Sequence, residues 1–196
     1  MSELEAKTKL YEIAEQQAGY FSAQQAQRAG ISKALLSHHV KSGRFLRIRR
    51  GVYRWAQFPE MPHADLFIAW LATGKKGVFS HETALMLYEL TDLLSAAIHL
   101  TVPRTASRRL PDVRFHTAHL RPEDITRRLG LPVTTLPRTL TDLIRAGVAE
   151  EWIQQAIQQA LARGLVSESV LREEAHQRGG HIAAQILAAL EHSHAV

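Results

Sequence analysis

The 196-residue sequence contains no cysteine. Disulfide bonds, thiolate metal ligands and a cysteine nucleophile are therefore excluded. No apolar run approaches the roughly 20 residues that a membrane helix needs, and no basic-then-apolar leader opens the chain. These absences predict a soluble cytoplasmic protein that has no membrane partner.

Common catalytic and cofactor motifs are missing as well. His81-Glu82 begins like the zinc-protease pattern H-E-x-x-H, but Leu85 occupies the position of the second histidine. His116 and His119 have the spacing of a ligand pair, yet no third ligand lies near them in the sequence, so we interpret them as surface histidines. There is no nucleophile elbow and no glycine-rich phosphate loop. We therefore expect no enzymatic activity, no catalytic residue, no metal site and no cofactor.

Acidic residues are absent from the segment KSGRFLRIRRGVYR, Lys41 to Arg54, which carries six basic side chains with apolar residues between them. The β-forming residues and the Arg50-Gly51 turn, where glycine accepts a positive φ, predict a basic β-hairpin. Its arginines are expected to face solvent or phosphate. Its apolar face is expected to consist of Phe45, Leu46, Ile48, Val52, Tyr53 and Trp55.

Helices are predicted before this hairpin. Leu4 to Gln17 is rich in helix formers, Ser22 and Gln25 fit a capping box that opens a second helix, and Ser32 is a plausible N-cap for a third. A helix, a tight turn, a second helix and a charged hairpin define a winged helix-turn-helix, which places one helix in the major groove and the hairpin beside it. The candidate DNA-binding residues are Lys33, Ser37, His38, Lys41, Arg44, Arg47, Arg49, Arg50 and Arg54.

His39 neighbours the inward positions Leu36 and Val40, so we interpret it as a half-buried histidine and not as a base reader. The charge distribution agrees with DNA as the partner of this end. Residues 1–60 carry ten Lys and Arg against five Asp and Glu, whereas residues 138–196 carry five against seven. The alternative for the basic hairpin is a solvated face that binds another protein. Its position after a helix-turn-helix favours DNA.

A second domain is predicted after the proline-containing segment Gln57 to His63. We expect a winged helix-turn-helix domain at residues 1–58 and a mixed α/β domain at 63–196, with short strands near Ile98, Val113 and Val133, a basic loop between the first two strands, and helices at its end. The fold class is therefore α+β. Asp142 has no nearby lysine and second acid of the kind a nuclease uses, so we interpret it as a polar anchor or a solvated helix position.

Several segments carry a family resemblance: AGYFSAQQAQRAGISKALLSHHVKSGRFLRIRRGVYR, SHETALMLYEL, IHLTVPR, LPVTTLPRTLTDLIRAG and ALARGLVSESVLREEA. They resemble AbiEi-type antitoxins of bacterial type IV toxin-antitoxin systems. The resemblance implies a winged helix-turn-helix that represses the system's own promoter. It also implies a C-terminal domain that acts as antitoxin against a nucleotidyltransferase-like toxin. A related group adds a restriction-type nuclease domain, and this sequence resembles the version without it.

The resemblance implies double-stranded DNA with an inverted repeat as one partner, bound as a homodimer, and the cognate toxin as another. Two alternatives stay open. One is a stand-alone winged-helix regulator whose second domain senses a ligand. The other is a nuclease-less relative of a DNA-processing endonuclease. Fold-level analogy does not choose among them, so the site residues must carry the functional claim.

Overall fold

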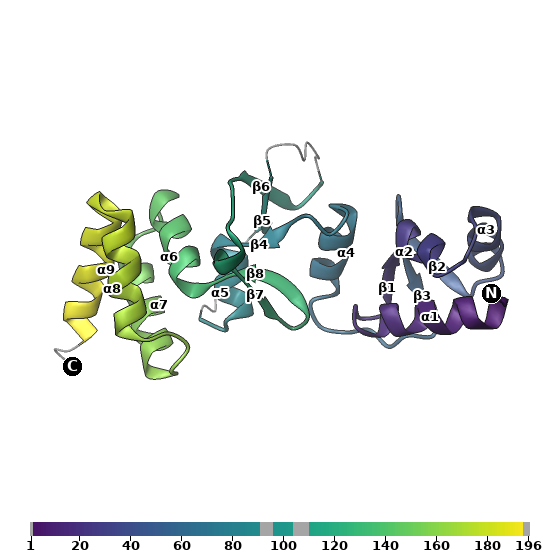
Figure 1. The fold of residues 1–196 in the computed structure, drawn as a ribbon, viewed down its shortest axis with the longest axis horizontal. Coiled ribbons are helices and arrows are strands. Elements are labelled where there is room, and N and C mark those ends of the chain that lie inside the picture. The colour runs from purple at the N-terminus through teal and green to yellow at the C-terminus, as the bar shows by residue number, and fades with distance from the viewer. Residues whose placement is uncertain (1, 91–95, 104–109, 194–196) are drawn as a thin grey trace. The chain divides into compact units, whose positions relative to one another are not determined.

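The computed structural model describes residues 2–90, 96–103 and 110–193 (Figure 1). The chain forms two compact units, one made mainly of the chain up to Gly77 and the other mainly of the chain from Val78 onward. Each unit contains its own β-sheet and its own helices, which confirms the α+β class. Within the described ranges, no helix is long and apolar enough to cross a membrane.

The N-terminal unit has the element order of a winged helix-turn-helix. Its strands form an antiparallel sheet in the order β1-β3-β2, and the wing is the hairpin of β2 and β3. The turn of the wing contains Gly51 at a φ of 79°, as the sequence predicts. The elements are α1 (Glu3–Glu15), β1 (Tyr20–Ser22), α2 (Ala23–Arg28), α3 (Lys33–Lys41), β2 (Phe45–Arg49), β3 (Val52–Trp55) and α4 (Ala64–Ala72).

Helix starts in this unit follow the predicted capping signals. Ser22 Oγ accepts a hydrogen bond from Gln25 N at 3.1 Å, and Gln25 Oε1 accepts one from Ser22 N at 2.8 Å, so the capping box of α2 is confirmed. Ser32 Oγ accepts from Leu35 N at 3.2 Å and caps α3. The strand β1 was not predicted, because only three residues pair there with β3.

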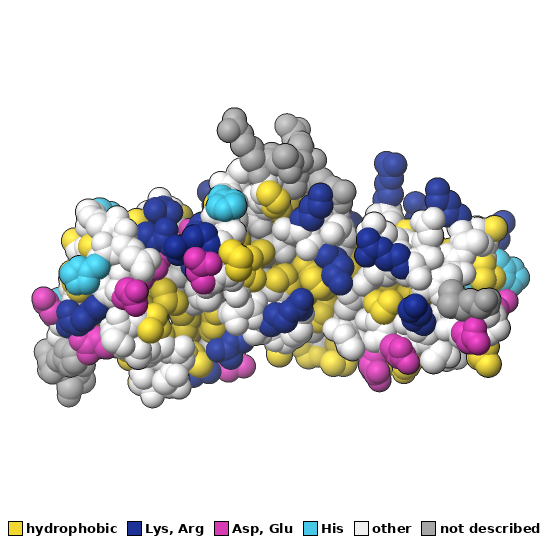
Figure 2. All heavy atoms as spheres, viewed as in Figure 1, with side chains coloured by type: hydrophobic (Ala, Val, Ile, Leu, Met, Phe, Trp, Pro, Cys, Tyr) yellow, Lys and Arg dark blue, Asp and Glu magenta, His cyan; other side chains and the backbone are white. Residues whose placement is uncertain are grey.

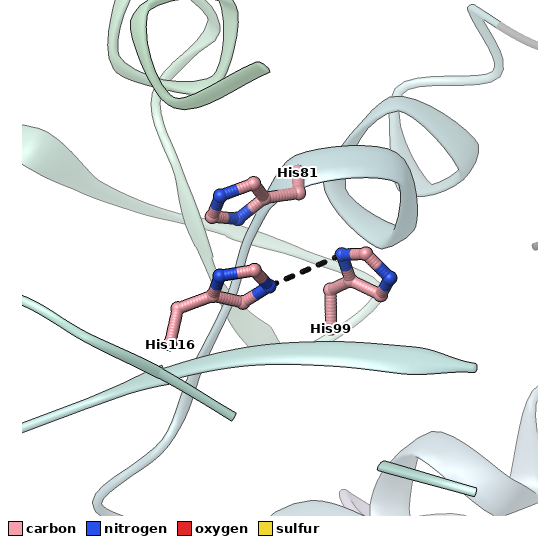
Figure 3. A group of neighbouring side chains, drawn as sticks. All are labelled: His81, His99 and His116. Carbon is pink, nitrogen blue, oxygen red and sulfur yellow. Dashed lines mark hydrogen bonds between the residues drawn. The ribbon is translucent and has the colours of Figure 1, made fainter. Parts of the chain in front are cut away.

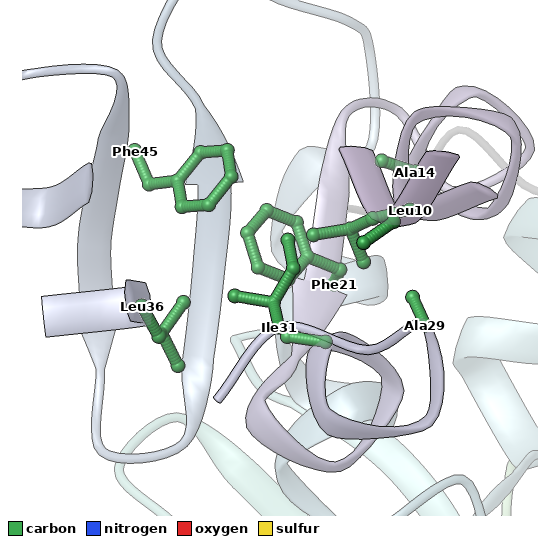
Figure 4. Packing of buried hydrophobic residues seen from close by; sticks show 9 residues of the cluster. Leu10, Ala14, Phe21, Ala29, Ile31, Leu36 and Phe45 are labelled. Carbon is green, nitrogen blue, oxygen red and sulfur yellow. The ribbon is translucent and has the colours of Figure 1, made fainter. Parts of the chain in front are cut away.

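A small apolar core fixes the wing and α3 relative to one another (Figure 4). Phe21 from β1 and Phe45 from β2 are fully buried, with ring centroids 5.0 Å apart in an edge-to-face arrangement. Leu10 from α1, Ile31 before α3 and Leu36 within α3 pack in the same cluster. The positions of α3 and the wing therefore depend on hydrophobic packing and not on the basic residues themselves.

The helix α4 lies against β1 and β3 in the N-terminal unit. This helix falls within the domain predicted at residues 63–196. The contacts divide the chain later, at Gly77. Whether residues 1–58 fold by themselves stays a prediction, and any fragment design should take account of α4.

The C-terminal unit is built on a mixed sheet with the strand order β6-β5-β4-β8-β7. The pairs β4–β8 and β5–β6 are parallel, while β4–β5 and β7–β8 are antiparallel. Two of the strands, β4 and β7, were not predicted, and the predicted basic loop after Pro103 lies outside the described residues except at its last position. The elements are β4 (Val78–Phe79), α5 (His81–Leu87), β5 (Ile98–Val102), β6 (Val113–Thr117), η1 (Pro122–Asp124), β7 (Ile125–Arg128) and β8 (Leu131–Thr134).

Four helices complete this unit: α6 (Leu136–Arg145), α7 (Glu150–Ala162), α8 (Glu168–Arg178) and α9 (Gly180–Ser193). The predicted apolar stripe of α7 is buried, with Ile153 and Ile157 among the most enclosed side chains of the chain. Ile186 and Leu190 of α9 are fully buried as well. In Figure 1, α9 lies beside α8 and α7, and the contacts of α9 with both helices agree. These stripes form the core of the helical part.

Candidate functional site

The exposed face of α3 carries four of the predicted DNA-binding residues. Leu36 and His39 are buried on the inner side of the helix. On this inner side, Leu36 and His39 pack against Phe45 of β2. The exposed residues are Lys33, Ser37, His38 and Lys41, so they share the outward face that a recognition helix offers to base edges.

The wing carries the second group of predicted residues. Arg44, Arg47 and Arg50 are exposed, and Arg49 is partly buried. The pairing of Arg47 with Tyr53 is followed by a register shift before Arg49 pairs with Val52, which is a β-bulge. A bulge redirects side chains and increases twist, so the wing arginines do not all point in one direction.

The expectation that Arg54 faces solvent is wrong. Its side chain is only 8 % exposed, donates from Nη2 to the carbonyl oxygen of Phe58, and lies over the ring of Tyr20. The register explains this placement, because Arg54 pairs with Tyr20 of β1 and so sits on a central strand. Arg54 therefore belongs to the packing of the N-terminal unit and not to its basic surface.

The predicted apolar face of the hairpin also needs correction. Phe45 and Trp55 form a cross-strand pair on the core side, but Leu46 is 41 % exposed and Ile48 is 39 % exposed. Successive side chains of a strand point to opposite faces, so neighbours of Phe45 cannot all point inward. The wing therefore presents two apolar side chains beside its arginines.

The basic residues of this surface have no acidic partners. Within the described part of the chain, none of the side chains of Lys33, Lys41, Arg44, Arg47, Arg49 and Arg50 forms an ion pair. Figure 2 shows Lys and Arg side chains projecting from the N-terminal unit. Apart from the attraction between Arg44 and Glu3, no carboxylate of the described residues pairs with these side chains, which suits a polyanionic partner.

His39 is more deeply buried than predicted, at 2 % exposure. Its ring packs edge-on against Phe45 with centroids 5.0 Å apart, and its Nε2 lies 3.6 Å from Glu3 Oε1. Burial lowers the pKa of His39, and the charges of Lys7 and Arg44 lower it further, against the opposing effect of Glu3. His39 is therefore neutral at neutral pH and is not a base reader.

This arrangement defines a class: a winged helix-turn-helix DNA-binding unit, the kind found in transcriptional regulators. Residues 9–56 match the sequence model of the AbiEi_4 family, described as "Transcriptional regulator, AbiEi antitoxin". The matched segment contains every residue of the exposed basic surface, and it covers 48 of the 196 residues. No curated protein matches the chain.

The C-terminal unit contains a buried network of charged residues around Arg138. Arg138 Nε donates to Asp142 Oδ1 at 2.9 Å, and its Nη1 donates to Asp124 Oδ2 at 3.1 Å. All three residues are at most 6 % exposed. Burial raises the pKa of Asp142 and Arg138 offsets only part of this, whereas hydrogen bonds from Arg121 outweigh burial and lower the pKa of Asp124. The interpretation of Asp142 as a polar anchor is confirmed.

Three histidines meet in the C-terminal unit, at the start of α5, in β5 and in β6 (Figure 3). Thr101 of β5 pairs with His116 of β6, and this register places His99 and His116 on the same face of the sheet. His116 Nε2 lies 3.2 Å from His99 Nδ1, and the ring of His81 stacks on that of His116 with centroids 3.6 Å apart. One ring nitrogen from each histidine lies within 4.8 Å of the other two.

The interpretation of His116 as a surface histidine is therefore wrong, while His119 is exposed as predicted. The sequence could not show the cluster, because positions 81, 99 and 116 come together only through strand pairing. Burial lowers the pKa of His81 to about 3, with the charges of His116 and His99 adding to the effect. Burial also lowers the pKa of His116 to about 4. Both rings are thus neutral at neutral pH.

Proposed function

We propose that this protein is a transcriptional repressor and antitoxin of a type IV toxin-antitoxin system, acting without enzymatic activity in the cytoplasm. The observation that carries the DNA-binding half is the exposed, unpaired basic surface of α3 and the wing. This surface lies entirely within the segment that matches a family of transcriptional regulators and antitoxins. Promoter DNA is therefore the first partner.

On DNA, α3 would enter the major groove with Lys33, Ser37 and His38 toward base edges. The wing would follow the phosphates through Arg47 and Arg50. The exposed Leu46 and Ile48 suit this position, since apolar wing residues contact sugars or enter the minor groove. We propose that two copies bind an inverted repeat, because one recognition helix reads only a few base pairs.

A binding assay with full-length protein and its own promoter tests the first half of the proposal. Arg47→Ala with Arg50→Ala should weaken binding, whereas Arg145→Ala, an exposed arginine of α6, should leave it unchanged. Fluorescence anisotropy at fixed salt measures both affinities. Equal affinities for the wing variant and the control would remove the wing from the DNA interface.

For the second half, we propose that the C-terminal unit neutralises a nucleotidyltransferase-like toxin encoded beside this chain. The family description names an antitoxin, but the match covers residues 9–56, so the assignment to the C-terminal unit rests on the resemblance of its own segments to AbiEi-type antitoxins. In a growth assay, co-expression of the full chain should rescue cells that express the neighbouring toxin. The double wing variant should still rescue them, provided that the toxin is expressed from an unrelated promoter.

This assay separates the proposal from a stand-alone regulator. If the full chain binds its promoter and does not rescue growth, the regulator interpretation is correct and the antitoxin half is wrong. If rescue disappears together with promoter binding in the wing variant, the two activities are not divided between the units as proposed.

A further inference from the structure

We propose that His81, His99 and His116 form a binding site for a divalent transition-metal ion, with Zn²⁺ as the best-suited ion, within the C-terminal unit. Nothing in the DNA-binding or antitoxin role requires this site. Three imidazoles are a donor set that proteins use for zinc and for neighbouring transition metals, and not for Mg²⁺ or Ca²⁺, which prefer oxygen ligands.

The distances between the rings fit such an ion. In a tetrahedral site with Zn–N bonds of about 2.0–2.1 Å, two ligand nitrogens lie about 3.3 to 3.4 Å apart. His116 Nε2 and His99 Nδ1 are already 3.2 Å apart. The third histidine has a nitrogen within 4.8 Å of these two, and its ring, stacked on that of His116 at an interplanar angle of 15°, would have to tilt out of the stack to point this nitrogen at the ion.

An acidic group lies next to the three rings. Glu82 Oε2 is 2.6 Å from His99 Nδ1, but no aligned hydrogen bond to this buried oxygen is formed within the described residues. His99 Nδ1 therefore faces both a carboxylate oxygen and the nitrogen of His116, and a single proton on it can satisfy only one of them. Glu82 is the candidate fourth ligand, and its Oε2 would move from 2.6 Å to about 3.3 Å from His99 Nδ1 in a tetrahedral site.

The backbone holds this arrangement in place at a conformational cost. His81 has a φ of 53°, in the left-handed region that side chains other than glycine rarely adopt. Its Nδ1 lies 2.9 Å from Ser80 Oγ, which accepts a hydrogen bond from Thr101 Oγ1 at 2.8 Å. This chain of contacts keeps the ring of His81 against that of His116.

The three histidines belong to three different segments, and His116 lies on β6, which among the described residues is an edge strand that pairs with β5 alone. A metal ion bound there would connect this edge strand to the start of α5. The ion would therefore act as a structural link that stabilises the folded C-terminal unit, because a ligand that binds only the folded state shifts the unfolding equilibrium.

The test uses the full chain without a polyhistidine tag, stripped with a chelator and dialysed against Zn²⁺ or Co²⁺. We expect one metal ion per chain by elemental analysis, a visible absorption spectrum typical of tetrahedral Co²⁺, and a thermal unfolding midpoint that rises with free metal. His116→Gln should weaken binding by more than the roughly 10- to 100-fold typical of losing an outer-shell partner. Glu82→Gln should weaken it to a smaller extent.

His119→Gln is the matched control, because this exposed histidine lies three residues from His116 and outside the cluster. It should bind metal as the unchanged chain does. Failure of the unchanged chain to bind one ion at micromolar free metal would overturn the proposal, and so would equal affinities for His116→Gln and His119→Gln. Circular dichroism establishes that each variant is folded, and since His116 is only half-buried, its replacement by glutamine should be tolerated.

Discussion

The two units use arginine in opposite ways. In the N-terminal unit, Arg44, Arg47 and Arg50 are exposed and form no ion pair within the described residues. In the C-terminal unit, Arg138 and Arg178 are enclosed and bonded to carboxylates. The same side chain stays unpaired at the surface of one unit and connects carboxylates inside the other, and the presence of a nearby carboxylate distinguishes the two environments.

This difference shows why charge alone is a weak guide to function. A cation that is paired inside the fold has its field largely cancelled, whereas an unpaired surface cation attracts polyanions and releases their counterions on binding. Arg54 is an example within the wing, because it belongs to the basic segment of the sequence but is buried on the central strand of the sheet. Each of the following predictions tests one side of this comparison.

The largest effect is expected from Arg138→Leu. The substitution leaves Asp124 and Asp142 buried without their shared cation, and losing one partner of a buried ion pair costs about 3–5 kcal/mol. The free energy of unfolding, measured with urea, should fall by this amount. Arg145→Ala, on the exposed side of the same helix, should change stability by less than about 0.5 kcal/mol. A loss below about 1 kcal/mol for Arg138→Leu would show that the network is not a structural link.

Base reading by α3 is expected to have the next largest effect. Lys33→Ala or His38→Ala should weaken binding to the operator by about 1–3 kcal/mol for each hydrogen bond to a base edge that the substitution removes, with a smaller effect on random DNA. Arg50→Ala, at the turn of the wing, should weaken both DNAs by the same factor. Competition binding with operator and random duplexes measures this difference. Equal losses of affinity on both DNAs for the α3 variants would mean that another surface reads the sequence.

Salt dependence sharpens the account of the wing. If about four basic side chains touch phosphates, the logarithm of the affinity should fall with the logarithm of salt concentration with a slope of about −3 to −4. Arg47→Ala should reduce this slope by about 1, while Ser37→Ala should leave it nearly unchanged. Titrations at several salt concentrations provide the slopes. An affinity that barely changes with salt would contradict a phosphate-binding wing.

Local signals explain how much of the N-terminal unit could be predicted. The helix caps at Ser22 and Ser32 are contacts between residues three positions apart in the sequence. The positive φ of Gly51 is set by the turn that contains it. Such signals are visible in the sequence because they act over a few residues. The positions of Arg54 and Leu46 depend instead on which strand lies beside them and on a bulge, and neither is visible in the hairpin segment itself.

The C-terminal unit shows the same limit more strongly. Strand β4 has two residues, and β7 lies in a polar segment. Neither strand therefore shows the alternation of apolar and polar residues that predicts a strand. The histidine cluster depends on the parallel register of β5 and β6, which joins residues 17 positions apart. One signal was available in principle: His99 and Thr101 alternate with apolar residues in β5, which marks a polar pair on one face of the strand.

The smallest expected effect concerns His39, the buried titratable residue of α3. Its pKa is lowered by burial and by Lys7, Arg44 and His38, while Glu3 opposes this shift. Between the lowered pKa and the ordinary value near 6.5, the unfolded chain binds a proton that the folded chain does not. The stability of the N-terminal unit should therefore be constant above about pH 6.5 and decrease as the pH falls below it.

His39→Leu removes this proton uptake and leaves an apolar side chain against Phe45, so it should flatten the dependence of stability on pH. Urea unfolding on both sides of pH 6.5 measures the slope for the N-terminal unit when it is followed by fluorescence in a Trp152→Phe background, because the two remaining tryptophans, Trp55 and Trp70, lie in that unit. The control is His38→Leu, which changes an exposed histidine of the same helix and should keep the slope of the unchanged chain. If the slope survives in His39→Leu, then a different group titrates, and the burial of this ring does not control how the recognition helix responds to acid.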